Sequence, residues 1–271
     1  MLRLGSLLLP WTPLLLALGY ALAEAVAALA RARGAGDARP SLLWLLLLAL
    51  LASRAGFVLQ HRADYATIGA MLDVRDRGFD AGVAWAVGAL GVALLVWRRA
   101  GLRRSLPAAA GAGALLVLCG QAMVRLATPP GPPLPAWVLP SPAGTPLRLQ
   151  SLRGTPLVIN LWATWCPPCR RELPMLVDAA RQMRGVHIVL VDQREPAPRV
   201  QAYLRAAGLQ PPLLAIDPHG ELAARYRSPG LPTTLFFNAD GTLQRMYVGE
   251  MSAATLRDGV GTLLDAAGAA R

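Results

Sequence analysis

The fold of the C-terminal half of this chain is decided by residues 160–174, which read NLWATWCPPCRRELP. Within them, two prolines separate Cys166 from Cys169, at the point where an apolar run ends and a helical pattern begins. Two thiols at this spacing can close and reopen a disulfide reversibly. The third cysteine, Cys119, lies far upstream in an apolar segment, where we expect a small buried hydrophobe rather than an electron relay. We therefore interpret the pair as a redox-active dithiol rather than as a structural disulfide.

A metal site is not indicated by the remaining candidate ligands. A closed zinc site needs about four ligands, and the three histidines (His61, His187 and His219) are scattered without the usual zinc-site spacing. We expect no bound metal, and no cofactor beyond the redox-active disulfide of Cys166 and Cys169.

The composition indicates a membrane protein. The chain has 271 residues, 54% of them hydrophobic, and a mean hydropathy of +0.40, with the apolar excess in the first half. A bilayer span takes roughly 20 apolar residues. Four segments are long enough, at residues 7–30, 41–60, 80–97 and 107–126. We expect an α-helical transmembrane anchor of four spans, in contact with lipid.

The net charge of +11 comes entirely from arginine. Neither half has a basic face interleaved with aromatic residues, so nucleic acid is not an expected partner. Seven arginines lie in the loops at 31–40 and 98–106, against four at the start of the chain and in the loop at 61–79. Because positively charged loops stay in the cytoplasm, we expect the C-terminal half in the periplasm, outside a bacterial inner membrane.

The first apolar segment has a second interpretation, as a cleavable signal peptide. Its charged start and the run Ala21-Leu22-Ala23 fit that pattern. The three remaining spans would then leave residues 128–271 in the cytoplasm. The arginine count favours four spans and the periplasm.

The chain divides into three parts by composition. Residues 1–127 form the membrane anchor, 128–146 a proline-rich linker and 147–271 an α/β domain. Eight of the 19 linker residues are proline, which predicts an extended spacer holding the domain off the membrane. Alternatively, these prolines pack on the domain as an N-terminal arm, anchored by Trp137 and Val138.

Short apolar runs alternate with helical patterns from Leu147 onward. The pattern predicts a central sheet covered on both faces, with a hairpin turn at residues 239–241. Strands are expected at 157–163, 186–191, 213–216, 233–238 and 242–248, and helices at 167–183, 198–207, 221–226 and from a cap at Ser252 to 267.

These elements carry a resemblance to a known family. Residues 160–174, followed by 217–220 (DPHG), 230–234 (GLPTT) and 238–241 (NADG), resemble the TlpA/ResA branch of thioredoxin-like proteins in order and spacing. The resemblance covers roughly residues 140–268. It implies a thioredoxin-like α/β fold and a membrane-tethered thiol–disulfide oxidoreductase. It also implies a reductase of protein disulfides, fed by a membrane electron donor and serving cytochrome c maturation or thiol protection.

The chemistry of the site follows from the helix start. Cys166 is expected at the N-cap of the helix, where backbone donors and the dipole favour a thiolate. It should be the exposed nucleophile, and the more buried Cys169 should resolve the mixed disulfide. Because Pro167 and Pro168 have no N–H to offer the sulfur, we do not expect a strongly acidic thiol.

Several residues are expected to support the dithiol. Pro232 matches the cis-proline of the family, which would let the backbone of Leu231 pair with substrate, although a plain turn into a strand is the alternative. Trp165 would add an apolar contact surface. Asn160 stands where thioredoxins proper keep a buried acid. Glu172 is the nearest candidate to take over its proton transfer, or is a solvated helix charge.

Residues 53–82 of the anchor resemble part of prolipoprotein diacylglyceryl transferase. The His-Gly-Gly signature of that family is replaced by Asp80-Ala81-Gly82-Val83. The departure implies an anchor without transferase activity.

Two other functions compete with the reductase. One is a protein thiol oxidase or isomerase of the DsbA kind, against which the long anchor and the missing inserted helical region count. The other is a redox sensor, in which the dithiol regulates a membrane region that binds lipid or a partner.

Overall fold

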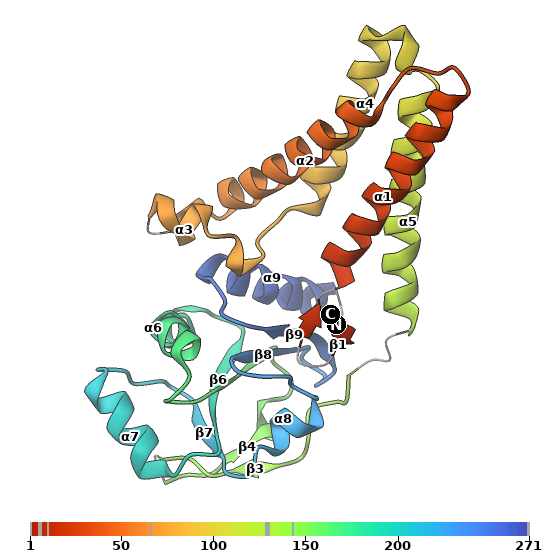
Figure 1. The fold of residues 1–271 in the computed structure, drawn as a ribbon. Coiled ribbons are helices and arrows are strands. Elements are labelled where there is room, and N and C mark those ends of the chain that lie inside the picture. Colours follow the sequence, from red (N-terminus) through yellow and green to blue (C-terminus); the bar gives the residue numbers. More distant parts are fainter. Residues whose placement is uncertain are drawn as a thin grey trace. The chain divides into compact units, whose positions relative to one another are not determined.

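The computed structural model describes residues 2–4, 7–9, 11–65, 67–127, 131–142 and 144–269. They form two compact units. The first comprises Met1–Gln60 and Gly78–Pro129, and the second comprises His61–Arg77 and Pro130–Arg271. Figure 1 labels most of their helices and strands.

The first unit contains four helices that are long and apolar enough to cross a membrane. They are α1 (Trp11–Ala32), α2 (Arg39–Gln60), α4 (Ala81–Arg98) and α5 (Ser105–Ala127). Their bounds agree with the four predicted spans, except that the first helix begins later than predicted. Residues 7–9 lie in a short strand, β2 (Leu7–Leu9), which pairs with β1 (Leu2–Leu4). The proline at position 10 disfavours helical backbone in the residue before it.

Helices α1 and α5 approach each other closely. A Cβ on Gly113 would lie only 2.6 Å from the carbonyl oxygen of Gly19. Gly113 and Val117 are buried on one face of α5, and Cys119, two positions further, is exposed. The prediction that Cys119 is a small buried hydrophobe is therefore wrong.

The second unit is built on a five-stranded sheet in the order β7-β6-β5-β8-β9. The strands are β5 (Leu157–Trp162), β6 (His187–Gln193), β7 (Leu214–Asp217), β8 (Thr233–Phe237) and β9 (Leu243–Val248). Strand β6 runs parallel to both β5 and β7, whereas β8 is antiparallel to β5 and β9. All five lie within two residues of the predicted ranges.

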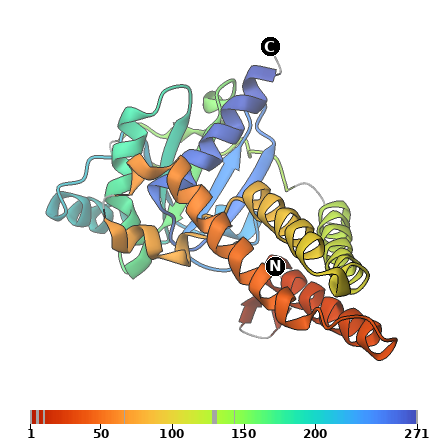
Figure 2. The same ribbon diagram turned by 90° about the horizontal axis from the view of Figure 1, so that it is seen from above.

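Helices cover both faces of this sheet, as predicted (Figures 1 and 2). They are α6 (Pro167–Gln182), α7 (Ala197–Ala206), α8 (Glu221–Arg225) and α9 (Ala253–Ala269). Because side chains alternate across a strand, Val158 and Trp162 enter one apolar cluster with Cys166 and Cys169, whereas Ile159 enters the cluster on the opposite face.

Two local signals behave as the sequence predicts. The hairpin between β8 and β9 turns at Gly241, whose φ is 84°, and the Asp240 carboxylate accepts from the N–H of Thr242 at 2.8 Å. At the start of α9, the hydroxyl of Ser252 accepts from the N–H of Thr255 at 3.2 Å, so Ser252 caps the helix.

The proline-rich segment is not the free spacer that we predicted. Its described residues, 131–142, belong to the second unit, with Leu134 and Leu139 buried against the sheet. Proline lacks an N–H but keeps its carbonyl, and the carbonyls of Pro133 and Pro140 accept from the Tyr226 hydroxyl and the Ile216 N–H. The alternative, an arm packed on the domain, is correct for these residues, but of its two predicted anchors only Trp137 packs on the core and Val138 is exposed.

This arm continues into the domain. Strand β3 (Val138–Leu139) pairs with β4 (Leu147–Arg148), and the 3-10 helix η4 (Leu149–Leu152) leads into β5. The domain therefore begins earlier than the predicted residue 147.

Residues 61–77 also belong to the second unit, although they lie between the apolar helices α2 and α4 in the sequence. They contain η1 (Arg62–Asp64), α3 (Ile68–Leu72) and η2 (Val74–Asp76). The sequence predicts only a loop of the anchor here, because these residues carry no strong local signal. Helix α4 is followed by one further 3-10 turn, η3 (Ala100–Leu102).

Candidate active site

The two cysteines stand where strand β5 hands over to helix α6. Cys166 is the N-cap of α6, and its sulfur is bonded to that of Cys169 at 2.05 Å. The fixed φ of a proline suits the first helical position, so Pro167 starts the helix without loss of a hydrogen bond. The N–H of Cys169 points at the Cys166 sulfur at 3.3 Å. It is the first backbone donor after the two prolines, as the sequence predicts.

The disulfide is less accessible than we expected. Cys166 is only 2% exposed, because its side chain is part of the apolar cluster beneath α6. Trp165 beside it is 65% exposed. Pro167 is exposed and Pro168 half-buried. In the oxidised form, the indole of Trp165 is thus exposed at the site whereas the sulfur of Cys166 is buried.

Glu172 lies one helical turn beyond Cys169 and points into the protein. It is 3% exposed, so its interpretation as a solvated helix charge is wrong. Its Oε1 accepts from the Asn160 side-chain amide at 2.9 Å, and its Oε2 accepts from the backbone N–H of Met251 at 2.9 Å. The Asn160 amide also donates to the Thr234 hydroxyl at 3.0 Å, across the β5–β8 pair.

The surroundings of Glu172 shift its titration toward neutrality. Burial raises the pKa of its carboxyl to about 7, and the hydrogen bonds from Met251 and Asn160 oppose part of that rise. A carboxyl with such a pKa can both accept and release a proton near neutral pH. Asn160 itself does not titrate. Its amide instead donates a hydrogen bond to Glu172, which does titrate.

Of the three residues predicted to contact substrate, Leu231 and Pro232 lie directly before β8, and Leu231 packs on the apolar clusters of both sheet faces. The Leu231–Pro232 peptide bond is cis, as predicted. Leu231 is half-buried and packs on the cluster that contains Cys166 and Trp162, and Pro232 is buried. Leu231 thus shares one packed cluster with the dithiol.

Sequence reasoning missed a second acidic group next to the dithiol loop. The Glu195 carboxylate accepts from the N–H of Thr164 at 2.5 Å and from its hydroxyl at 2.7 Å. Asp192, fully buried at the end of β6, accepts from the N–H of Glu195 at 3.2 Å. The carboxyl ends of parallel neighbours meet at one edge of a sheet, so acids directly after β6 could have been placed beside the loop that follows β5.

Asp192 and Glu195 repel each other's charge. Burial, then the adjacent Glu195 carboxyl, raises the pKa of Asp192. Among the residues that the structure describes, Asp192 Oδ2 has no hydrogen-bond partner. Asp192 therefore stays protonated to a higher pH than an exposed aspartic acid does.

We expect Asp192→Asn to stabilise the domain at alkaline pH. An acid whose pKa is raised by folding destabilises the fold increasingly as pH rises from its unfolded pKa of about 4 to its folded value. The amide retains the acceptor for Glu195 N–H but cannot ionise, so the free energy of unfolding should rise by about 1–3 kcal/mol at pH 8 and be unchanged near pH 3. Urea unfolding of the oxidised chain measures this. Asp258→Asn, at an exposed acid, is the control; a pH-independent change would contradict the prediction.

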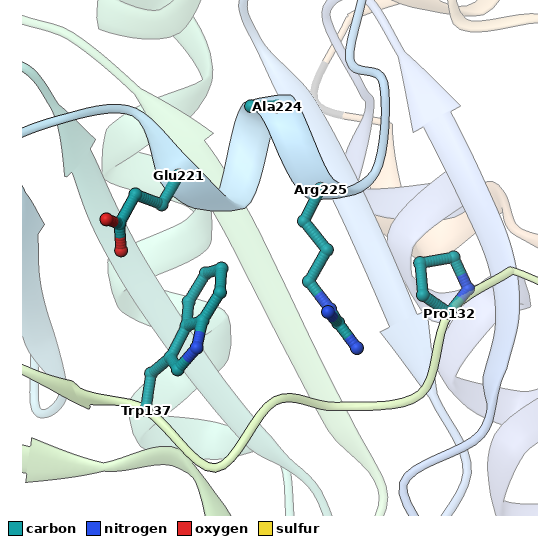
Figure 3. Close-up of a pocket in the computed structure, with 5 residues that line it drawn as sticks. All are labelled: Pro132, Trp137, Glu221, Ala224 and Arg225. Carbon is teal, nitrogen blue, oxygen red and sulfur yellow. The ribbon is translucent and has the colours of Figure 1, made fainter.

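A surface pocket of about 570 Å³ lies elsewhere in the second unit. It is lined by Pro132, Trp137, Glu221, Ala224 and Arg225, none of them a predicted site residue (Figure 3). The Arg225 guanidinium lies 5.7 Å from the centre of the Trp137 ring and donates to the Pro133 carbonyl. These contacts hold the proline-rich arm and do not reach the dithiol. Within the described residues, no group of three His, Cys, Asp or Glu side chains is placed to hold a metal.

Comparisons with known proteins concern this half of the chain. Residues 130–246 match the model of the AhpC/TSA family. The chain is 31% identical over 129 residues to a protein of Geobacillus thermodenitrificans named thiol-disulfide oxidoreductase ResA, covering 47% of this chain and 74% of that protein. A Geobacillus kaustophilus protein of the same name is 32% identical over 124 residues, 45% of this chain and 71% of its own length.

Among solved structures, a thiol:disulfide interchange protein of Chlorobium tepidum is 30% identical. The match has a TM-score of 0.44 and covers 51% of this chain and 98% of that one.

Proposed function

Because this chain belongs to the ResA-like thiol–disulfide oxidoreductases, we propose that it is a membrane-anchored, extracytoplasmic reductase of protein disulfides. The observation that carries the proposal is the Cys166–Cys169 disulfide at the N-terminus of α6, in a thioredoxin-like sheet. No further cofactor is needed, since the two sulfurs themselves carry the electrons.

The reaction starts from the reduced dithiol. The Cys166 thiolate attacks one sulfur of a substrate disulfide, which forms a mixed disulfide and releases the first substrate thiol. The Cys169 thiolate then attacks the Cys166 sulfur, and the second substrate thiol leaves. The substrate gains two electrons and two protons, and the protein ends as the disulfide seen in the structure. An external dithiol donor, in our proposal a membrane protein, returns the two electrons.

Two features of the site favour the thiolates. The helix dipole and the Cys169 N–H stabilise charge on the Cys166 sulfur. Glu172, one turn from Cys169, is the group we assign to accept the proton of the resolving thiol. The proton transfer is thereby served by a carboxyl that is half ionised near neutral pH.

Recognition of a protein substrate is proposed for the surface around the sulfurs. Trp165 offers an exposed indole, and the backbone around Leu231 and Pro232 offers a strand-like partner for an extended segment. Such a contact reads backbone rather than sequence, which suits an enzyme with several clients.

Membrane attachment and orientation are also part of the proposal. The four apolar helices support membrane attachment, and the excess of arginine in two of the loops supports an extracytoplasmic C-terminal half. The resemblance of residues 53–82 to the diacylglyceryl transferase remains a prediction. The family matches fall on the other half of the chain, and we propose no transferase activity.

Thiol trapping in cells tests the proposed direction. In a Cys119→Ser background, acid quenching followed by alkylation should find Cys166 and Cys169 mostly reduced, because a reductase is recharged by its donor. A largely oxidised pair would support the DsbA-like oxidase instead.

The same cells can be used to test on which side of the membrane the C-terminal half lies. Trypsin added to spheroplasts should degrade the arginine-rich C-terminal half while a cytoplasmic marker stays intact. Protection of that half until the membrane is lysed would contradict the extracytoplasmic location and favour the signal-peptide interpretation.

A further inference from the structure

The segment between the second and third membrane spans is anchored on the catalytic domain. We call residues 61–77, as far as they are described, the docking segment; they belong to the same compact unit as the domain. Its central residue is Asp76, which is 7% exposed. Figure 1 shows α3 and the turn that follows it near the start of α9.

Four hydroxyl groups converge on Asp76. Its backbone carbonyl accepts from the Tyr247 hydroxyl at 3.1 Å and from the Thr255 hydroxyl at 3.0 Å. Its carboxylate Oδ2 accepts from the hydroxyls of Tyr65 at 2.8 Å and Ser252 at 3.1 Å. Three of the four donors belong to the domain, so Asp76 is the point at which the segment is fixed.

Two further contacts hold the segment. The Asp64 carboxylate, 4% exposed, pairs with Arg257 of α9 at 2.6 Å. The Arg77 guanidinium lies 5.5 Å from the centre of the Tyr247 ring, within cation–π range. Only the Asp64 side of the first pair is buried, since Arg257 is 61% exposed, so removing Arg257 would leave a buried carboxylate uncompensated.

The same contacts lead to the dithiol. Residues 249–252, which we call the β9–α9 connection, join Tyr247 and Ser252 to the active-site helix. The Tyr247 hydroxyl lies 3.3 Å from the Glu250 carbonyl, and the Glu250 carboxylate pairs with Arg171 of α6 at 2.5 Å. The next residue, Met251, donates its N–H to Glu172. The connection is therefore held by the docking segment on one side and by α6 on the other.

We propose that the docking segment is a positioning element of the dithiol site: by fixing Tyr247, Ser252 and Thr255, Asp76 holds the β9–α9 connection so that Met251 N–H reaches Glu172. The inference rests on the proposed function and deepens it. Asp76 touches neither sulfur and acts through Met251 and Glu172.

The physical consequence concerns the charged form of Glu172. The Met251 N–H stabilises the carboxylate, so a connection that drifts away leaves a buried charge with one donor fewer. The other groups that face Glu172 are the neutral Asn160 amide from β5, the Tyr247 phenol from β9, and Glu250, whose negative charge also disfavours ionisation. None of them replaces the lost donor, so Glu172 becomes harder to ionise when the segment is released.

The docking also fits the membrane topology. The segment precedes two spanning helices, α4 and α5, and the domain follows them. An even number of crossings returns the chain to the same side, so the segment and the domain can meet without either crossing the bilayer. A single soluble domain cut from the chain at the proline-rich arm would lack this element.

The test compares Asp76→Ala with Asp76→Asn in the full-length chain in detergent micelles, with Asp258→Asn as the control acid on α9. The alanine removes the side-chain acceptor for Tyr65 and Ser252, whereas the asparagine oxygen keeps it. We expect Asp76→Ala to lower the exchange rate at pH 7 by about 3–10-fold and to move the midpoint of the pH–rate profile upward. Asp76→Asn should restore both, and trypsin should cleave after Arg62 and Arg77 faster in the alanine variant only.

A second variant guards against general destabilisation. Thr255→Val removes one hydroxyl donor to Asp76 with little change of shape, and Thr262→Val removes a hydroxyl of α9 that bonds only within the helix. The first should shift the pH midpoint upward and the second should not. Two results would overturn the positioning role. One is faster trypsin cleavage of the docking segment in Asp76→Ala with an unchanged midpoint of the pH–rate profile. The other is an equal shift of that midpoint in both threonine variants. Failure of the proposed function would look different, since the unmodified chain would then show no exchange.

Discussion

Cys166→Ser should lower the rate of protein-disulfide reduction by about 10³-fold or more, because a hydroxyl cannot replace the attacking thiolate. The helix N-terminus and the Cys169 N–H stabilise negative charge at this atom. The measurement is reduction of insulin by the chemically reduced full-length chain in micelles. Cys119→Ser, on the exposed face of α5, is the matched control and should leave the rate within about twofold of the unmodified chain.

Cys169→Ser should give the complementary result. Attack by Cys166 still forms the mixed disulfide, but no second thiol remains to resolve it, so the complex accumulates. It should appear on non-reducing gels as a band of added mass that disappears with reductant, and mass spectrometry of that band would identify the client. Were the Cys169 variant to trap nothing while the Cys166 variant trapped partners, the assignment of the two roles would be reversed.

Glu172→Gln should remove the rise near pH 7 from the pH profile of the rate at which Cys169 resolves the mixed disulfide. With a pKa of about 7, Glu172 is mostly protonated at pH 5 and mostly ionised at pH 9, so the group we assign as proton acceptor becomes available as pH rises through 7. General base catalysis contributes about 10²-fold or more, and the glutamine variant should fall behind the unmodified chain by roughly that factor at pH 8. At pH 5 the two should be nearly equal, because the side chain at position 172 is uncharged in both: a protonated carboxyl in one and an amide in the other.

Single-turnover kinetics with a preformed mixed disulfide measure this step. Asp178→Asn, at an exposed acid of the same helix, is the control and should keep the step near pH 7. A glutamine variant whose profile overlays that of the unmodified chain would show that another group takes the proton of Cys169.

The local elements of this protein were predictable because their signals are short-range. The cap at Ser252, the turn at Gly241 and the helix start at Pro167 each depend on residues within a few positions. The apolar spans depend only on length and composition. The cis bond before Pro232 came instead from the family resemblance.

The errors concern segments whose partners lie far away in the sequence. Proline content alone predicts an extended spacer at 131–142. In the structure this segment packs on the domain, because the Pro133 carbonyl accepts a hydrogen bond from Tyr226 and Leu134 is buried in the core. The docking segment has no strong local signal, and its partners lie some 170 residues later. Only a folded domain brings those hydroxyls together around Asp76.

The identity of the reacting groups was thus determined by the sequence itself: two sulfurs at a helix start, an amide at position 160 and an acid one turn beyond the second sulfur. Their working properties were decided by the tertiary structure. The burial of Cys166, the near-neutral pKa of Glu172 and the hold of residue 76 on the β9–α9 connection all arise from desolvation and hydrogen bonds between distant segments. A linear pattern names a titratable or nucleophilic group, but the water excluded around that group depends on everything packed against it.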